Sequence, residues 1–103
     1  MIVRVWKARA TAENMPAYRQ HLKTHVFPIL QSLSGFLGAD LMERTDDEEI
    51  EFVVTSRSQS MKAVREFSGD AMERAVVAPG AKAVLASYEE VVAHYEVTAE
   101  CKV

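Results

Sequence analysis

The chain has 103 residues, a length typical of one domain, and we expect residues 1–103 to form a single one. Hydrophobic residues make up 49% of the chain and charged residues 26%, which argues against a disordered protein. Lysine and arginine number 12 against 15 aspartates and glutamates, so the chain lacks the basic excess that nucleic-acid binding needs.

The cysteine content and the hydropathy pattern predict a cytoplasmic protein. Cys101 is the single cysteine, so an intrachain disulfide is excluded and a reducing compartment is expected. No apolar run reaches the roughly 18 to 20 residues that a membrane helix needs, so we expect no membrane contact. Arg4, Lys7 and Arg9 interrupt the first apolar stretch, which is therefore not expected to be a signal peptide.

The first two predicted elements are a strand and a long helix. Residues 2–9 are rich in β-branched and aromatic types, and both faces of this strand carry large apolar side chains. Residues 12–33 form a helix, because apolar residues recur there at three-, four- and seven-residue spacing. Pro28 has no amide hydrogen to donate to the Thr24 carbonyl, so we expect a kink or break at that point.

Two strands and two short helices follow. Residues 36–44 and 50–57 are predicted strands, joined by an acidic, turn-prone segment into a hairpin. Ser60 is the expected cap of a helix over residues 60–68, and glycine ends it. A capping-box pattern predicts a further short helix over residues 71–77.

Residues 88–97 are the last predicted strand. Ala93 and Tyr95 alternate with His94 along it, and we expect the first two to face the helices and His94 the opposite side of the sheet. The element order is β-α-β-β-α-β, which predicts an α+β, ferredoxin-like fold with a four-stranded antiparallel sheet and helices on one face. The helix-free face also carries apolar residues, so we expect a second subunit to cover it in a homodimer.

Five segments together resemble the antibiotic biosynthesis monooxygenase domain. In chain order they read IVRVWKARA, GFLGADLMER, EFVVTSRSQSMKAVREFSGD, the AVV-x-P that follows, and VVAHYEV. The resemblance covers about residues 1–97 and implies the dimeric α+β barrel superfamily, in which two sheets face each other and enclose a cavity over each one. Members with known activity include cofactor-free oxygenases acting on polycyclic aromatic or quinol substrates, and haem-degrading enzymes.

One departure from this family lies just before the second helix. Relatives commonly have a tryptophan there, in a Trp-x-Ser segment, whereas this chain has Ser58 and keeps the serine as Ser60. In active members that tryptophan helps to shape or polarise the pocket, so its absence argues strongly against haem degradation and, to a lesser degree, against quinol oxygenation. The resemblance implies a cofactor-independent monooxygenase acting on a small aromatic or quinol ligand. The alternatives are a non-catalytic dimeric barrel that binds a small apolar ligand and a purely structural dimer.

His94 is the candidate general base. A histidine can remove a proton from a phenol or quinol, because its pKa lies near the working pH. The resulting electron-rich carbanion can reduce dioxygen without a cofactor. The alternative is a structural histidine that bonds across the dimer interface.

Further candidates could line the dimer cavity that His94 is expected to face. Trp6 could stack on a flat aromatic ligand, and Arg4 could stabilise a developing oxyanion. Alternatively, Trp6 fills the dimer interface and Arg4 pairs with Glu90 or Glu96. The remaining candidates for ligand contact are His25, Tyr88 and Arg57.

A metal or nucleotide site is not expected. His21 and His25 are four residues apart, a spacing that can place two imidazoles on one metal ion, but no cysteine or HExxH pattern accompanies them. The acidic run 46–49 lacks the spacing of a calcium loop, and the chain has no glycine-rich phosphate loop. We therefore expect no cofactor, and we interpret His25 as an edge-of-core residue that also contacts the cleft.

Overall fold

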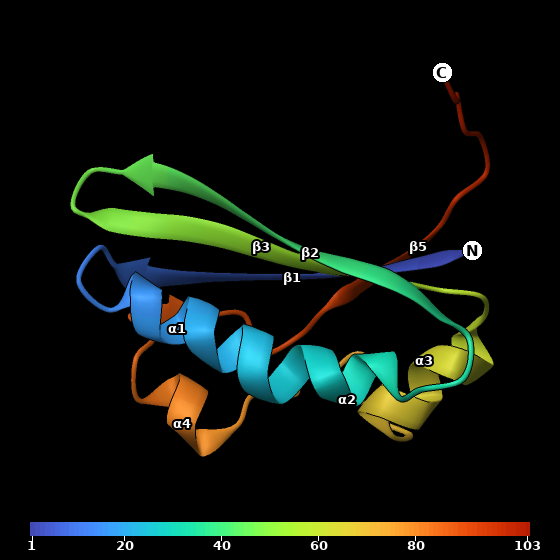
Figure 1. Ribbon diagram of the computed structural model, residues 1–103, viewed down its shortest axis with the longest axis horizontal. Coiled ribbons are helices and arrows are strands. Elements are labelled where there is room, and N and C mark those ends of the chain that lie inside the picture. Colours follow the sequence, from blue (N-terminus) through green and yellow to red (C-terminus); the bar gives the residue numbers. More distant parts are fainter.

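The protein is an antiparallel sheet covered by helices on one face, as the computed structural model of residues 1–103 shows (Figure 1). In chain order the elements are β1 (Ile2–Thr11), α1 (Met15–His21), the π-helical segment η1 (Leu22–Val26), α2 (Phe27–Gln31), β2 (Phe36–Asp46), β3 (Glu49–Ser58), α3 (Met61–Ser68), α4 (Pro79–Lys82), β4 (Ser87–Tyr88) and β5 (Ala93–Glu96). The strand order is β2-β3-β1-β4, and β5 pairs with the other end of β1. The predicted α+β, ferredoxin-like class is confirmed.

The pairing register of β1 determines which side chains face the helices. Trp6 lies opposite Val54 of β3, and Ala8 lies opposite Phe52. Both Ala8 and Phe52 are buried. Because side chains alternate along a strand, Arg4 shares the helix-covered face with Trp6 and Ala8.

The core lies between this face of the sheet and α1. Phe52, Met15 and Leu22 are its fully buried large side chains. The Phe52 ring lies 4.6 Å from the Tyr18 ring and 5.9 Å from the Trp6 ring, measured between centroids. The apolar stripe of the first helix therefore packs on the sheet, as its spacing predicts.

The long helix predicted over residues 12–33 runs from Met15 to Gln31 and contains the expected interruption. The Phe27 amide donates to the carbonyl of Leu22, five residues back, so η1 is a π-helical turn. Pro28 follows directly, and its ring crowds the preceding helical turn while offering no amide hydrogen. The wider π turn accommodates the proline without ending the helix.

The expected ends of α3 are confirmed. The Ser60 side chain accepts a hydrogen bond from the Ala63 amide at 3.3 Å, which caps the first turn. Gly69 follows the last turn with a φ of 73°, a left-handed conformation that glycine adopts without strain. These local signals act through backbone groups that lie within one helical turn.

The predicted helix over residues 71–77 is wrong. Arg74 instead forms an isolated antiparallel bridge with Val91. The carbonyls of Met72 and Arg74 accept hydrogen bonds from the Arg4 side chain, at 2.7 and 2.9 Å. These carbonyls are already bonded and cannot accept the hydrogen bonds of a helix. The segment therefore makes a single turn and is extended after it.

The predicted strand over residues 88–97 is divided, and its predicted faces are wrong. β4 and β5 pair with opposite ends of β1, and the residues between them leave it. His94 lies opposite Arg4 on the helix-covered face, whereas Tyr95 is 60% exposed on the other. Both alternating sets contain apolar residues, so polarity could not decide which set faces the helices.

None of the helices combines the length and the apolar content that a membrane crossing requires.

Candidate functional site

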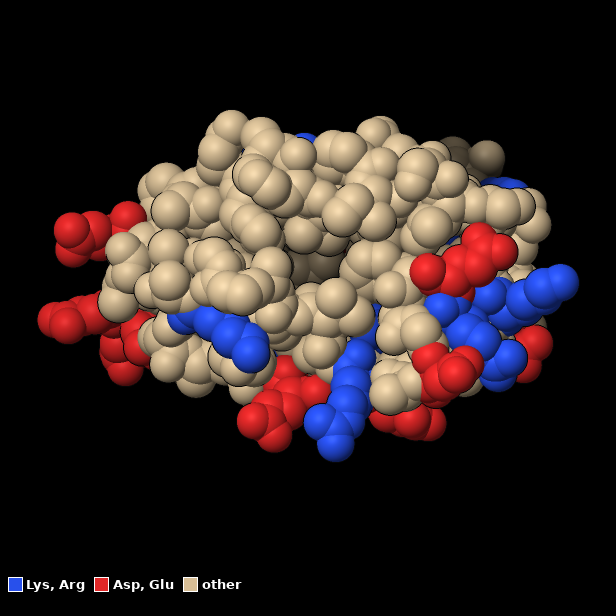
Figure 2. Space-filling model, turned by 90° about the horizontal axis from the view of Figure 1, so that it is seen from below, with Lys and Arg blue, Asp and Glu red and all other residues tan.

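A cavity of about 170 Å³ lies between the sheet and the long helix. Residues of β1 and β3 form its wall on the side of the sheet, and residues of α1, η1, α2, α3 and segment 76–81 form the wall opposite. Seventeen residues line it, of which 13 are hydrophobic. Figure 2 looks onto the helical side, where a central hollow is surrounded by uncharged side chains and the charged residues lie at the periphery.

The volume of the cavity suits one aromatic ring. An apolar protein cavity of about 150 Å³ is known to hold benzene. Pockets for drug-sized ligands are larger, roughly 300–1,000 Å³. The ligand that fits without opening the helix from the sheet is therefore a small, largely apolar molecule.

Arg4 is a buried cation on the wall of this cavity. It is 7% exposed, and its guanidinium lies 5.7 Å from the centre of the Phe67 ring. Besides its bonds to two backbone carbonyls, Nη1 lies 3.0 Å from Nε2 of His94. Arg4 takes part in none of the ion pairs, so the pairing with Glu90 or Glu96 does not occur.

His94 lies behind Arg4 and is not among the residues that line the cavity. An arginine can only donate, so Nε2 of His94 accepts from Arg4 and the proton of the neutral ring is on Nδ1. Burial, followed by the positive charge of Arg4, lowers the pKa of His94. His94 is thus placed to orient Arg4, with its basic nitrogen already bonded.

His94 is expected to make the protein less stable in mild acid. Its pKa in the folded protein is below the ordinary value of 6.5, so the unfolded chain binds the proton first as the pH falls. The contribution of the neutral ring to stability is complete above about pH 6.5, the pKa of histidine in the unfolded chain. It is lost as the pH falls from there toward the lower pKa of His94 in the folded protein. His94→Asn should flatten this decline in urea-unfolding midpoints, whereas an undiminished decline would assign it to another group, such as His21.

Trp6 forms a fixed wall of the cavity. Its Nε1 donates to the Glu89 carbonyl at 2.7 Å, and its ring lies 6.2 Å from that of Tyr18 and 6.3 Å from that of Tyr88. Tyr88 therefore supports Trp6 and does not itself line the cavity. Of the sequence candidates, Arg4, Trp6 and His25 are brought together on the cavity wall.

Arg57 lies away from the cavity. Its Nη1 is 2.6 Å from Oδ2 of Asp40, with which it forms an ion pair. Arg57 pairs in register with Val3, on the helix-free side of the sheet. Its role as a ligand contact has no geometric support, because alternation directs residue 57 away from Ser56 and the cavity.

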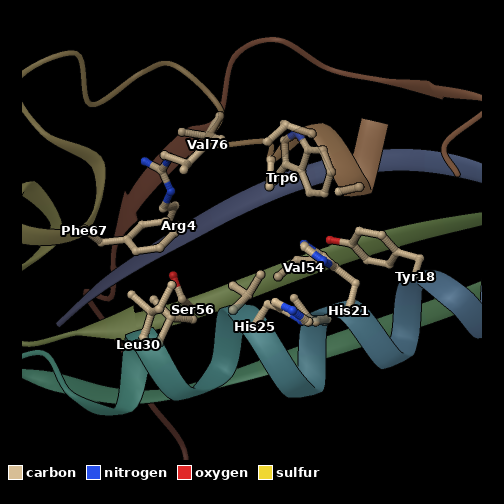
Figure 3. Close-up of a pocket in the computed structure, with 17 residues that line it drawn as sticks. Arg4, Trp6, Tyr18, His21, His25, Leu30, Val54, Ser56, Phe67 and Val76 are labelled. Atoms are coloured by element: carbon tan, nitrogen blue, oxygen red, sulfur yellow. The ribbon is translucent and has the colours of Figure 1, made fainter. Parts of the chain in front are cut away.

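His21 and His25 project from the helix at the cavity wall, as Figure 3 shows. Their rings are stacked, with centroids 5.2 Å apart and planes 13° from parallel. The Thr24 hydroxyl donates to the Gln20 carbonyl at 2.7 Å, so it must accept from Nδ1 of His25, also at 2.7 Å. Nε2 of His25 is therefore left with a free lone pair, while burial and then the neighbouring His25 lower the pKa of His21.

Tyr18 and Ser56 are polar cavity residues that sequence reasoning missed. Tyr18 is 3% exposed, and burial raises the pKa of its hydroxyl. No side-chain hydrogen bond involves the Tyr18 hydroxyl, although every fully enclosed polar side-chain atom has a partner. The hydroxyl is therefore not enclosed, and it opens onto the cavity that Tyr18 lines. The signal for Ser56 was a polar residue that shares a strand face with Phe52, whereas Tyr18 resembled an ordinary core residue.

The comparisons with known proteins show similarity in structure alone. No protein-family profile matches the sequence, and no curated protein is detectably similar to it. A candidate antibiotic biosynthesis monooxygenase from Bacillus cereus superposes with a TM-score of 0.73 at 14% identity, over 100% of this chain and 96% of that one. A candidate antibiotic biosynthesis monooxygenase from Deinococcus radiodurans superposes with a TM-score of 0.69 at 17% identity, over 100% of this chain and 98% of that one.

The haem-degrader MhuD from Mycobacterium tuberculosis superposes with a TM-score of 0.65 at 20% identity, over 99% of this chain and 100% of that one. That structure has two haems bound in its active site. This chain has the fold of the antibiotic biosynthesis monooxygenase structures. The family resemblance of its five sequence segments is thus confirmed at the level of the fold, which by itself does not assign a reaction.

Proposed function

We propose that the protein is a cofactor-independent monooxygenase that oxidises a one-ring phenol or hydroquinone in the cavity between the sheet and η1. The observation that carries this proposal is the cavity itself, which has ring-sized volume and apolar walls. Five residues with polar groups, Arg4, Tyr18, His21, His25 and Ser56, line this otherwise apolar space. Similarity in fold to candidate monooxygenases supports the reaction type.

The proposed reaction balances without a cofactor. A hydroquinone and dioxygen give a hydroxyquinone and water: one oxygen atom enters the ring, and the other leaves as water. All the electrons that reduce dioxygen come from the hydroquinone, so no external reductant is needed. The task of the protein is to deprotonate the substrate and to stabilise the anion, which is the species that reacts with dioxygen.

The polar residues divide this task. His25 is the group that takes the phenolic proton, because Nε2 has a free lone pair at the cavity. Arg4 stabilises the oxyanion from the sheet, and His94 acts as a positioning residue through its contact with Arg4. Trp6 contacts the face of the ring.

Oxygen consumption tests the proposal. One-ring hydroquinones should be oxidised with one dioxygen consumed per hydroxyquinone formed, and polycyclic anthrones should react more slowly because they exceed the cavity volume. Ligand binding can be followed in parallel by the fluorescence of Trp6, the single tryptophan. Binding without oxygen uptake would favour the non-catalytic ligand-binding barrel, and neither binding nor uptake would favour a purely structural dimer.

We also propose a homodimer formed through the open face, the helix-free sheet surface around Val5, Val53, Met42 and Tyr95. Met42 of β2 is 52% exposed there, and Tyr95 of β5 is 60% exposed, with β3 and β1 between these two strands. Such an apolar sheet surface in a small chain is typical of an obligate interface, which commonly buries about 2,000 Å² or more in total.

Val53→Glu is expected to convert this dimer to a monomer in sedimentation equilibrium, because it places a charge in the centre of the open face. Ala17→Glu, on the exposed side of α1, adds the same charge on the opposite side of the molecule and should leave the dimer intact. A wild-type protein that sediments as a monomer at micromolar concentration would refute the proposal.

A further inference from the structure

We propose that the cavity is selective for a one-ring aromatic anion, whose charged oxygen binds Arg4. This inference rests on the proposed ligand site and adds the charge of the ligand to it. The observation behind it is that Arg4 is a buried cation on an apolar cavity wall with no acidic partner. Carboxylate and phenolate share this chemistry, and the test below distinguishes them.

The groups around Arg4 leave its charge uncompensated. Three of its N–H bonds are directed to the Met72 carbonyl, the Arg74 carbonyl and the neutral His94 ring. The ring of Phe67 adds a favourable but uncharged contact. An isolated charge removed from water without a counter-ion destabilises a protein strongly, and an anion in the cavity would relieve this.

The arginines that form ion pairs contrast with Arg4. Arg9 lies 2.7 Å from Glu49, Arg19 lies 2.6 Å from Glu43, and each of these pairs is partly exposed. Arg4 is the only buried arginine, and it has no carboxylate partner. Glu73 raises the pKa of His94, but it is exposed and forms neither an ion pair nor a hydrogen bond with Arg4.

Arg4 also has donors to spare for a ligand. A guanidinium carries five N–H bonds, and Nε of Arg4 donates none of its own within the protein. Every fully enclosed side-chain nitrogen of the protein has a hydrogen-bond partner. Because Nε of Arg4 has none, it is not fully enclosed, and a ligand in the space that Arg4 lines can reach its N–H. A side void of about 10 Å³ between Arg4, Ser56 and Phe67 has room for about one water-sized atom, such as a carboxylate oxygen.

The arrangement of the cavity gives the ligand a direction. In Figure 3, Arg4, Phe67 and Ser56 lie at one end, and Tyr18 and His21 lie toward the other. An anionic oxygen at Arg4 would place the apolar ring beside Trp6 and Val54, which pair across β1 and β3. The opposite edge of the ring would then face the Tyr18 hydroxyl.

Isothermal titration calorimetry with matched ligand pairs tests this proposal on the wild-type protein. Benzoate should bind roughly 10–100-fold more tightly than benzamide, which has the same shape and no charge, because a charge-assisted hydrogen bond is the difference. An ionised nitrophenol against its methyl ether tests phenolate in the same way. Preference for either anion supports the proposal and identifies its source. Equal affinities in both pairs would overturn it while leaving the proposed ligand site in place.

Substitution of Arg4 tests the assignment to this residue. Arg4→Gln should remove the preference for benzoate and leave benzamide binding within about twofold, whereas Arg65→Gln, an exposed control on α3, should change neither affinity. A preference that survives in folded Arg4→Gln would overturn the assignment. If this variant does not fold, the ligand pairs measured on the wild-type protein still decide whether the cavity prefers an anion. If neither the anionic nor the neutral aromatic ligands bind, the proposed ligand site itself is wrong.

Discussion

His25→Phe is expected to lower oxygen uptake with a one-ring hydroquinone by roughly 10²–10⁴-fold, the range that a general base contributes. Phenylalanine keeps a flat ring beside His21 and removes the basic Nε2. The measurement is the rate per mole of folded protein, with the unfolding midpoint as the control for structure. Binding of the substrate, followed by Trp6 fluorescence, should change far less than the rate.

His94→Ala separates the two candidate bases. Because His94 contacts Arg4 and does not line the cavity, its loss should weaken binding of aromatic anions together with the rate. The loss of His25 should lower the rate and leave a normal affinity for benzoate. If His25→Phe retains full activity while His94→Ala abolishes turnover without affecting binding, the base is the one that the strand pattern predicted.

Phe52→Ala is expected to reduce the free energy of unfolding by about 3–5 kcal/mol, the usual range for truncating a buried phenylalanine. Phe52 is fully buried, and its ring lies against both Tyr18 and Trp6. Urea unfolding measures the loss. The exposed Leu37 offers a control, because Leu37→Ala should change stability by no more than about 0.5 kcal/mol.

The same Phe52 variant should also impair the site. Truncation removes the support beneath Trp6 and Tyr18, both of which line the cavity. Aromatic ligands should therefore bind more weakly, in samples kept cold enough to remain folded. A loss of stability below about 1 kcal/mol would contradict the position of Phe52 at the centre of the core.

Local sequence determined those elements whose signals act within a few residues. Ser60 and Gly69 delimit α3, because each satisfies or terminates the backbone of the adjacent turn. The acidic hairpin between β2 and β3 forms where it was predicted, with Asp47 in a left-handed conformation at the turn. From the resulting element order the ferredoxin-like fold follows, since connection rules leave few arrangements for such a chain.

Tertiary structure overruled the sequence where contacts distant along the chain compete with a local preference. The capping-box pattern that begins at Asp70 favours a helix, but a short helix is only marginally stable by itself. The bridge of Arg74 to Val91 and the bonds from Arg4 to the segment outweigh it. Arg4 precedes its partners by about 70 residues, so no local pattern could show that these carbonyls would be occupied.

The candidate site shows the same division. The sequence alone determined that His94 and Tyr95 lie on opposite faces of a strand, because side chains alternate with a period of two. Which face carries the helices was decided by the register of His94 with Arg4, and this register placed His94 behind the arginine. It was likewise the packing of the long helix on β1 and β3 that brought His25 and Tyr18 to the cavity, since helical spacing defines a face but not the surface that covers it.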